Sequence, residues 1–279
     1  MSLKQLFGWR TLPLWMGGLL LAFVAARVLL VQPSNERSWK PEHSEAPRVE
    51  IEGDEVRVEN VRNFFYHTAD SFDVRFEDRV YDLASLETVW FVLSPFRDNW
   101  RGPAHSFLSF GFSDSTYVSI SVEARKEVGE SYSVWKGLLR NYELLYVIGD
   151  ERDLVGLRAV HWQDDVYVYP VRARREQCRS LFVSMLERAE KLRVAPEFYN
   201  TALSNCTTNI YDAVKLLSPE DWSYSWKLQL PGYSDELVFE KGVLNTDLNL
   251  EAARERFRVN EKAVRFFTDS SFSTRIREP

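Results

Sequence analysis

The order in which strand and helix patterns follow one another constrains this fold more than any other sequence feature. Across the first half, segments of β-branched and aromatic residues alternate with polar ones, which is typical of half-buried strands. Ser113, Asp114 and Ser115 form a turn signal between two of these segments and predict an antiparallel hairpin. The predicted strands are 55–61, 72–81, 88–93, 104–112, 116–123, 142–148 and 166–171.

Helical periodicity replaces the strand pattern in the second half. Apolar residues recur three or four positions apart over 174–193, and a second stripe covers 205–217. Strands followed by helices predict an α+β fold with an antiparallel sheet and packed helices. After Leu250 we expect one short helix and then an irregular tail that wraps the domain.

The N-terminus carries an apolar run from Leu12 to Val31. It is close to the ~20 residues that a helix needs to cross a bilayer. Basic residues within 1–11 predict that these residues are cytoplasmic and that 12–31 is a single-pass signal anchor in the inner membrane. A cleaved signal peptide, with Val24 and Ala26 at the cleavage site, is the alternative. Both alternatives export the rest of the chain.

Residues 32–47 are polar and contain three prolines, which is typical of a linker, and the periplasmic domain is predicted to span 48–279. The whole chain has 35 basic and 41 acidic residues. Removing the three basic residues of the first 33 leaves 32 against 41, a net charge of −9. Nucleic-acid binding requires a basic surface, so we expect no nucleic-acid partner.

The two cysteines, Cys178 and Cys206, have different surroundings in the sequence. Ser204 or Asn205 can cap the second helix, which places Cys206 in the first turn, where helix N–H groups favour a thiolate and can hold an oxyanion. A buried structural role is the alternative for Cys206. Cys178 lies inside an apolar stripe, so we expect a buried, inert thiol. A disulfide between the two would exclude a reactive Cys206.

A nucleophilic thiol requires an imidazole base. Of the four histidines, His43 falls in the linker, His67 follows three aromatic residues, and His161 is expected in a loop. His105 begins a strand after the 100–103 loop and is best placed to face a helix N-terminus. No His, Asp or Glu cluster has metal-ligand spacing, and we expect no metal or cofactor.

Polar residues alternate along the second hairpin strand. Ser119, Ser121, Glu123 and Arg125 share one face. A tight turn places Glu123 across from His105, where it can accept the imidazole N–H and fix its tautomer. The alternative is a surface pair between Glu123 and Arg125.

Six blocks resemble, in this order, the Lnb N-terminal periplasmic domain family, over roughly Val61 to Arg277. The family is similar to permuted papain-like (NlpC/P60-like) hydrolases and acyltransferases, in which His precedes Cys. The resemblance implies that Cys206 is the nucleophile and His105 the base, and that Asn205, Thr207, Ser121, Glu123 and Arg125 fill polar motif positions. The blocks are VRNFFYHTADSF, PAHSFLSFGF, ISVEARKEVGESYS, YVYPVRARREQ, YNTALSNCTTNIYD and FSTRIREP.

The name-giving members of this family are implicated in N-acylation of bacterial lipoproteins through an acyl-thioester. The resemblance therefore implies a membrane-tethered, cysteine-dependent acyl-transfer enzyme, with lipoproteins and phospholipid acyl donors as partners at the inner membrane. Peptidoglycan or peptide amide hydrolysis uses the same chemistry and is one alternative. A catalytically silent envelope-binding or assembly module, with a structural Cys206, is the other.

Overall fold

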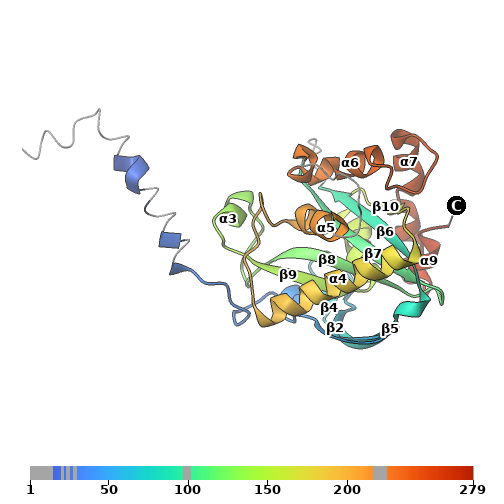
Figure 1. The fold of residues 1–279 in the computed structure, drawn as a ribbon, viewed down its shortest axis with the longest axis horizontal. Coiled ribbons are helices and arrows are strands. Elements are labelled where there is room, and N and C mark those ends of the chain that lie inside the picture. Colours follow the sequence, from blue (N-terminus) through green and yellow to red (C-terminus); the bar gives the residue numbers. More distant parts are fainter. Residues whose placement is uncertain are drawn as a thin grey trace, which may run out of the picture.

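A central sheet carries helices on both of its faces (Figure 1). The computed structural model describes residues 15–19, 22, 26–27, 30–96, 102–215 and 225–278, and within these ranges the main sheet has eight strands. Their spatial order is β1-β2-β9-β8-β7-β6-β10, with β5 also paired to β2. The strands are β1 (Arg48–Glu52), β2 (Glu55–Arg62), β5 (Phe76–Asp82), β6 (Leu86–Pro95), β7 (Ala104–Phe112), β8 (Tyr117–Arg125), β9 (Glu143–Gly149) and β10 (Tyr167–Pro170).

The pairings confirm the predicted antiparallel sheet and its hairpin. β7 and β8 pair in antiparallel register, with Phe107 opposite Ser121, across the predicted turn. The contact between β2 and β9 is parallel and is limited to Arg62 and Gly149. A separate short ribbon joins β3 (Phe65–Tyr66) to β4 (Phe72–Asp73).

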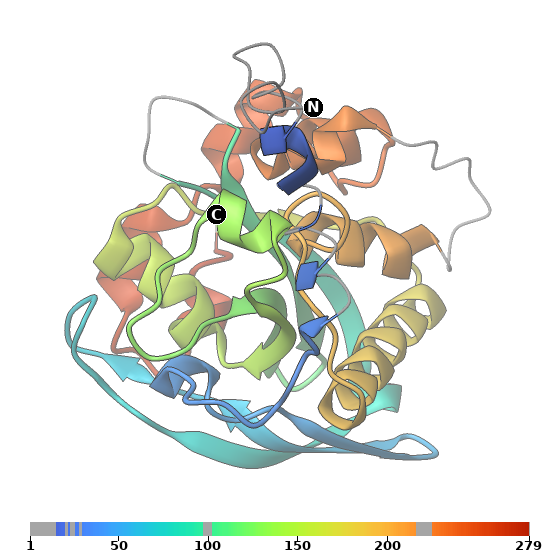
Figure 2. The ribbon, with the colours of Figure 1, turned by 90° about the vertical axis from the view of Figure 1, so that its left-hand side faces the viewer.

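Two layers of helices cover the sheet. On one face lie α4 (Arg175–Val194) and α5 (Cys206–Lys215), and on the other lies η3, a π-helix over Arg152–Trp162, as Figure 2 shows for α4 (yellow) and η3 (yellow-green). The remaining helices are α3 (Val134–Leu138), α6 (Ser234–Glu240), α7 (Leu250–Phe257), α8 (Asn260–Phe266) and α9 (Phe272–Arg275), with short 3-10 turns η1 (Pro41–His43), η2 (Leu83–Ser85), η4 (Trp226–Leu228) and η5 (Pro231–Tyr233).

Because both faces are covered, β7 is buried along its whole length. Leu108 packs into the core under α4 and α5, whereas its neighbour Phe107 packs into the core under η3 and the C-terminal helices. The period-2 alternation of a strand therefore distributes apolar side chains to two separate cores. This burial fixes the start of β7, and with it the position of His105.

The structure differs from the sequence predictions at several places. The predicted strand 72–81 is split into β4 and β5, and β1 and β3 were not predicted. His161 lies in η3 and not in a loop. The sequence did not predict this helix, because a π-helix has i→i+5 bonds and lacks the 3.6-residue period by which helices are recognised. The tail wraps the domain as expected, but it forms α8 and α9 beyond the one predicted helix. Residues 216–217 of the predicted second helix lie outside the described residues.

Half of the expected membrane segment 12–31 lies outside the described residues, as do all of 1–11 and residues 97–101 of the loop before His105. Among the described residues, no helix combines the length and the apolar character that a membrane crossing requires.

The predicted linker 32–47 packs against the domain. His43 is 3% exposed, and its Nδ1 accepts the backbone N–H of Lys126 at 2.9 Å. Arg125 donates to the carbonyl oxygens of His43 and Ser44 at 2.9 and 3.0 Å and stacks on Trp39. Although residues 32–47 are polar, they are therefore not a free, extended segment, because the buried guanidinium of Arg125 binds backbone carbonyls within them.

Candidate active site

Cys206 is the first residue of α5, and only 4% of its surface is exposed. Asn205 caps the helix, since its Oδ1 accepts the backbone N–H of Thr208 at 2.9 Å. Ser204 or Asn205 was predicted to cap this helix, and Asn205 does so. The N–H groups of the first turn have no partner within the helix, so they direct partial positive charge toward the thiol.

His105 connects the thiol to a carboxylate. Its ring and the Cys206 thiol shift one another's pKa through charge and hydrogen bonding. Its Nε2 lies 2.6 Å from Ser121 Oγ and 3.2 Å from Glu123 Oε1. The position of Glu123 across from His105 agrees with the sequence prediction.

Glu123 is held from three sides. The Ser121 hydroxyl and the Arg158 guanidinium donate to Glu123 Oε1 at 2.8 and 3.0 Å. Burial by itself raises the pKa of Glu123, but His105 and Arg158 outweigh it and hold that pKa well below its usual range. The alternative surface pair with Arg125 is wrong, because Glu123 is turned to His105 and Arg158 while Arg125 is 2% exposed.

The shifted pKa values describe a charged pair. Burial alone lowers the pKa of His105, but the charge of Glu123, assisted by Cys206, raises it to about 9. Burial alone raises the pKa of Cys206, but the charge and hydrogen bond of His105, with hydrogen bonds from Ser106, lower it to about 7. Both shifts favour a Cys206 thiolate that faces a His105 imidazolium.

Two hydroxyl groups lie beside the thiol. Ser106 is fully buried, and its Oγ lies 3.1 Å from Thr207 Oγ1. Thr207 Oγ1 lies 3.8 Å from Cys206 Sγ. The sequence predicted Thr207 as a site residue but not Ser106. The signal for Ser106 is its position directly after His105 on β7, which brings its backbone N–H close to the Cys206 thiol.

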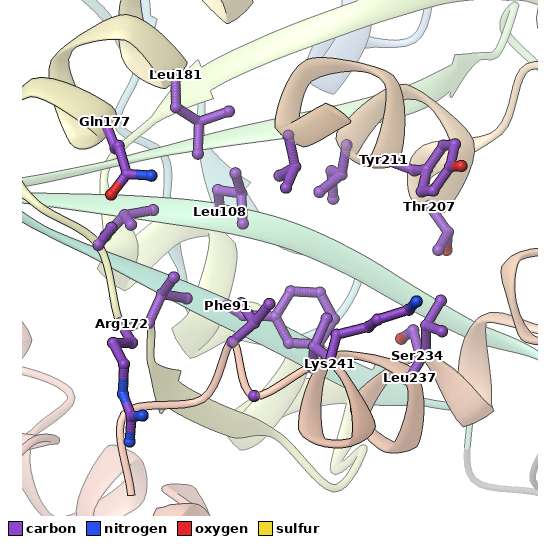
Figure 3. Close-up of a pocket in the computed structure, with 18 of the residues that line it drawn as sticks. Phe91, Leu108, Arg172, Gln177, Leu181, Thr207, Tyr211, Ser234, Leu237 and Lys241 are labelled. Carbon is purple, nitrogen blue, oxygen red and sulfur yellow. The ribbon is translucent and has the colours of Figure 1, made fainter. Parts of the chain in front are cut away.

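An apolar cavity of about 330 Å³ begins beside Thr207 (Figure 3). It lies between the sheet strands β6 and β7 and the helices α4, α5 and α6. Arg172 and Gln177 line its opposite end. Its apolar lining includes Phe91, Leu108, Leu181, Ile210, Val214 and Leu237.

Two of the predicted binding residues are engaged in local structure. Asn205 donates from Nδ2 to the Thr201 carbonyl at 2.9 Å while its Oδ1 caps α5. Arg125 is occupied by the 35–44 segment, where Nη1 also donates to Asn35 Oδ1 at 2.9 Å. The other two, Ser121 and Thr207, belong to the site, because Ser121 lies next to His105 and Thr207 lies next to Cys206.

Cys178 is buried at 1% exposure, as predicted, and burial raises the pKa of its thiol to about 11. Cys178 and Cys206 are both free, so no disulfide competes with a reactive Cys206. Among the other histidines, His67 is exposed beside Asp73, and His161 packs on Phe267.

Arg158 was missed by sequence reasoning. It lies on η3, is 4% exposed, and stacks over Phe107 while it binds Glu123. No local motif marks it, because it is 35 residues from Glu123 in the sequence and its helix lacks regular periodicity. Within the described ranges, no three His, Cys, Asp or Glu side chains gather as metal ligands do.

Replacing Glu123 with Gln is expected to raise the pKa of Cys206, because the neutral amide no longer supports the charge on His105. For each pH unit by which the thiol midpoint rises, alkylation of Cys206 at neutral pH slows by about tenfold. Iodoacetamide labelling across pH, read by mass spectrometry, measures this midpoint. Glu127→Gln is the matched control, and an equal midpoint in both variants would show that Glu123 does not position the imidazole.

A family model described as the Lnb N-terminal periplasmic domain matches residues 72–231, more than half of the chain. The match includes His105, Glu123 and Cys206. No curated protein and no solved structure matched the chain in the corresponding comparisons.

Proposed function

The chain belongs to the Lnb N-terminal periplasmic domain family, and on this basis we propose that it is a periplasmic, membrane-tethered acyltransferase that works through a thioester on Cys206. We infer a permuted papain-like arrangement, in which His105 on a strand precedes Cys206 at a helix start. The observation that carries the proposal is that Thr207, the residue directly after Cys206 at the start of α5, lines an apolar cavity.

In the first half-reaction, the Cys206 thiolate adds to the carbonyl carbon of a donor ester. As the C–O bond breaks, His105 gives its proton to the departing alcohol, and the acyl group stays on sulfur. We propose that the first-turn N–H groups of Cys206 and Thr207 receive the oxyanion, because the N–H of Thr208 already donates to the Asn205 cap.

In the second half-reaction, an amine adds to the thioester carbonyl and the C–S bond breaks. His105 accepts the amine proton, and Cys206 leaves as a thiolate, which restores the starting state. The products are an amide and the original charged pair. Water in place of the amine gives hydrolysis, so the chemistry of the pair is shared with the hydrolase alternative.

The cavity favours acyl transfer over cleavage of a polar polymer. Its volume of about 330 Å³ falls within the range of about 300–1,000 Å³ that is typical of small-molecule sites. Its lining is largely aliphatic, and burying an alkyl chain there is favourable whereas burying sugar hydroxyls without partners is not. An acyl chain in the cavity, with its carbonyl at Cys206, is the arrangement that we propose. By resemblance, the acceptor is a lipoprotein amine.

The test is to incubate the full chain with phospholipid vesicles of one defined acyl length and to digest it for mass spectrometry. We expect one acyl group on the Cys206 peptide, removable by neutral hydroxylamine, whose mass follows the chosen lipid. Cys178→Ala is expected to acylate normally, and Cys206→Ala to remain unmodified. Absence of acylation, together with cleavage of peptidoglycan fragments that depends on Cys206, would replace the proposal with the hydrolase.

A further inference from the structure

A group of apolar side chains stands in solvent around α3. Trp135 is 76% exposed, and Leu203, on the loop before α5, is 79% exposed. Exposed apolar side chains that gather on one part of a surface can mark an interaction site. We call this group the α3 patch, and it consists of Tyr132, Val134, Trp135, Leu138, Leu139 and Leu203.

The α3 patch is fixed relative to Cys206. α3 packs closely on the 200–204 loop, because a Cβ on Gly137 would come within 2.1 Å of Thr201 Oγ1. The Thr201 hydroxyl donates to the Val134 carbonyl at 3.1 Å. Since Asn205 donates to the Thr201 carbonyl at 2.9 Å, the patch, the loop and the start of α5 form one hydrogen-bonded unit.

The same surface meets the end of the N-terminal apolar run. Arg27 Nη2 donates to the carbonyls of Leu139 and Arg140 at 3.2 and 3.3 Å, and to Asn141 Oδ1 at 2.9 Å. Figure 1 shows α3 at the end of the molecule from which the N-terminal segment departs. The apolar residues 12–31 therefore end beside the α3 patch.

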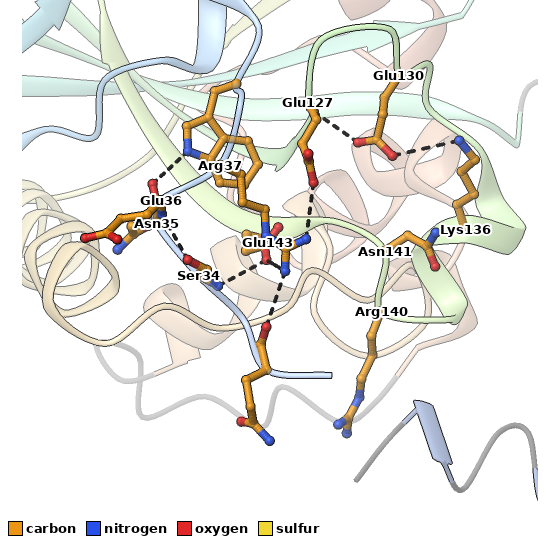
Figure 4. A network of polar contacts seen from close by, with 12 residues as sticks. Ser34, Asn35, Glu36, Arg37, Glu127, Glu130, Lys136, Arg140, Asn141 and Glu143 are labelled. Atoms are coloured by element: carbon orange, nitrogen blue, oxygen red, sulfur yellow. Dashed lines mark hydrogen bonds and ion pairs between the residues drawn. The ribbon is translucent and has the colours of Figure 1, made fainter. Parts of the chain in front are cut away.

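Polar contacts hold the chain against the domain at this point. Ser34 N donates to Glu143 Oε1 at 3.1 Å, and Arg37 pairs with the same carboxylate at 2.8 Å (Figure 4). Arg140, next to Leu139 in the sequence, adds positive charge at the patch, whereas Lys136 is paired with Glu130 at 3.9 Å (Figure 4). Aromatic and aliphatic side chains accompanied by cations are suited to the headgroup region of an anionic bilayer.

We propose that the α3 patch is a membrane-docking surface, seated in the periplasmic leaflet of the membrane that holds residues 12–31. The occupant is the lipid interface itself, since the apolar run enters the bilayer at this surface. Docking orients the start of α5 toward the lipids. The inference depends on the proposed membrane anchor but not on the proposed acyl transfer.

The test uses the full chain in a Cys178→Ala, Cys206→Ser background, reconstituted into vesicles of phosphatidylethanolamine and phosphatidylglycerol. An environment-sensitive fluorophore is attached at Trp135→Cys or Leu203→Cys. Val80→Cys is the matched control, because Val80 is 63% exposed on β5, away from α3 (Figure 1). Spin-labelled lipid in the vesicles then quenches only those labels that touch the bilayer.

We expect quenching at Trp135→Cys and Leu203→Cys to exceed that at Val80→Cys by about twofold or more, because an interfacial apolar face lies about 5–10 Å deep. Equal, weak quenching at all three positions would overturn the docking surface. A second result would also overturn it: a label on the patch whose emission is blue-shifted, is not quenched by lipid and changes with protein concentration. That result would mean that a second copy of the chain covers the patch. Because Cys206 is absent, none of these outcomes depends on acyl transfer.

Discussion

Replacing His105 with Ala is expected to slow acylation of Cys206 by about 10²–10⁴-fold, the usual contribution of a positioned acid–base group. The imidazole supplies both the charge that lowers the pKa of Cys206 to about 7 and the proton for the leaving group. Without the charge of His105, burial raises the pKa of the thiol and only the hydrogen bonds from Ser106 oppose it, so the attacking thiolate becomes scarce at neutral pH. The acylation rate on defined vesicles, followed by mass spectrometry, measures the loss.

The matched control is His67→Ala, because His67 is exposed and pairs with Asp73 on the separate β3–β4 ribbon. We expect acylation in this variant to equal that of the unmodified chain. A His105→Ala variant that acylates at a rate within a few-fold of His67→Ala would remove His105 from the chemistry.

Replacing Asp153 with Ala is expected to lower the free energy of unfolding by about 3–5 kcal/mol. Asp153 is fully buried on η3 and accepts two hydrogen bonds from Arg62 of β2, at 2.7 and 2.9 Å. It also accepts the backbone N–H of Phe64 at 2.9 Å. Truncation leaves the buried Arg62 guanidinium without its counter-charge, which costs more than the lost contact alone.

Removing both charges should lower the free energy of unfolding far less than removing Asp153 alone. The double variant Arg62→Met, Asp153→Leu leaves no unpaired ion, and such replacements range from neutral to about 1–4 kcal/mol stabilising. Glu50→Ala tests an exposed pair with Arg48 and should cost at most about 1 kcal/mol. Denaturant unfolding followed by circular dichroism compares the three. A small loss in Asp153→Ala, similar to that in Glu50→Ala, would contradict the structural role.

Sequence reasoning succeeded where local pattern and burial agree. The bounds of β7 were predicted residue for residue, because aromatic and aliphatic residues recur along it and a Ser-Asp-Ser turn follows it. The same turn fixed the hairpin register, so Glu123 was placed across from His105. The polar residues before Cys206 predicted the start of α5, because a cap satisfies N–H groups that the helix leaves open.

The features that the sequence did not predict depend on contacts between segments that are distant along the chain. Arg158 reaches Glu123 from a π-helix, whose spacing gives no 3.6-residue stripe. The pairing of Arg62 with Asp153 joins residues 91 positions apart, and neither has a distinctive neighbour in the sequence. Residues 32–47 have the composition of a linker, yet buried Arg125 holds their carbonyls. These arrangements follow from tertiary packing, which local composition does not specify.

The pH dependence of Cys206 alkylation tests most directly whether His105 holds this thiol as a reactive thiolate. Iodoacetamide labelling of the full chain is read at both cysteines, so Cys178, with a pKa raised to about 11, is an internal control. Thiolate accumulates above the pKa, and the expected midpoint for Cys206 is near pH 7, with labelling much faster than at Cys178. A Cys206 midpoint near pH 9, or labelling no faster than at Cys178, would contradict the charged pair and the acyltransferase built on it.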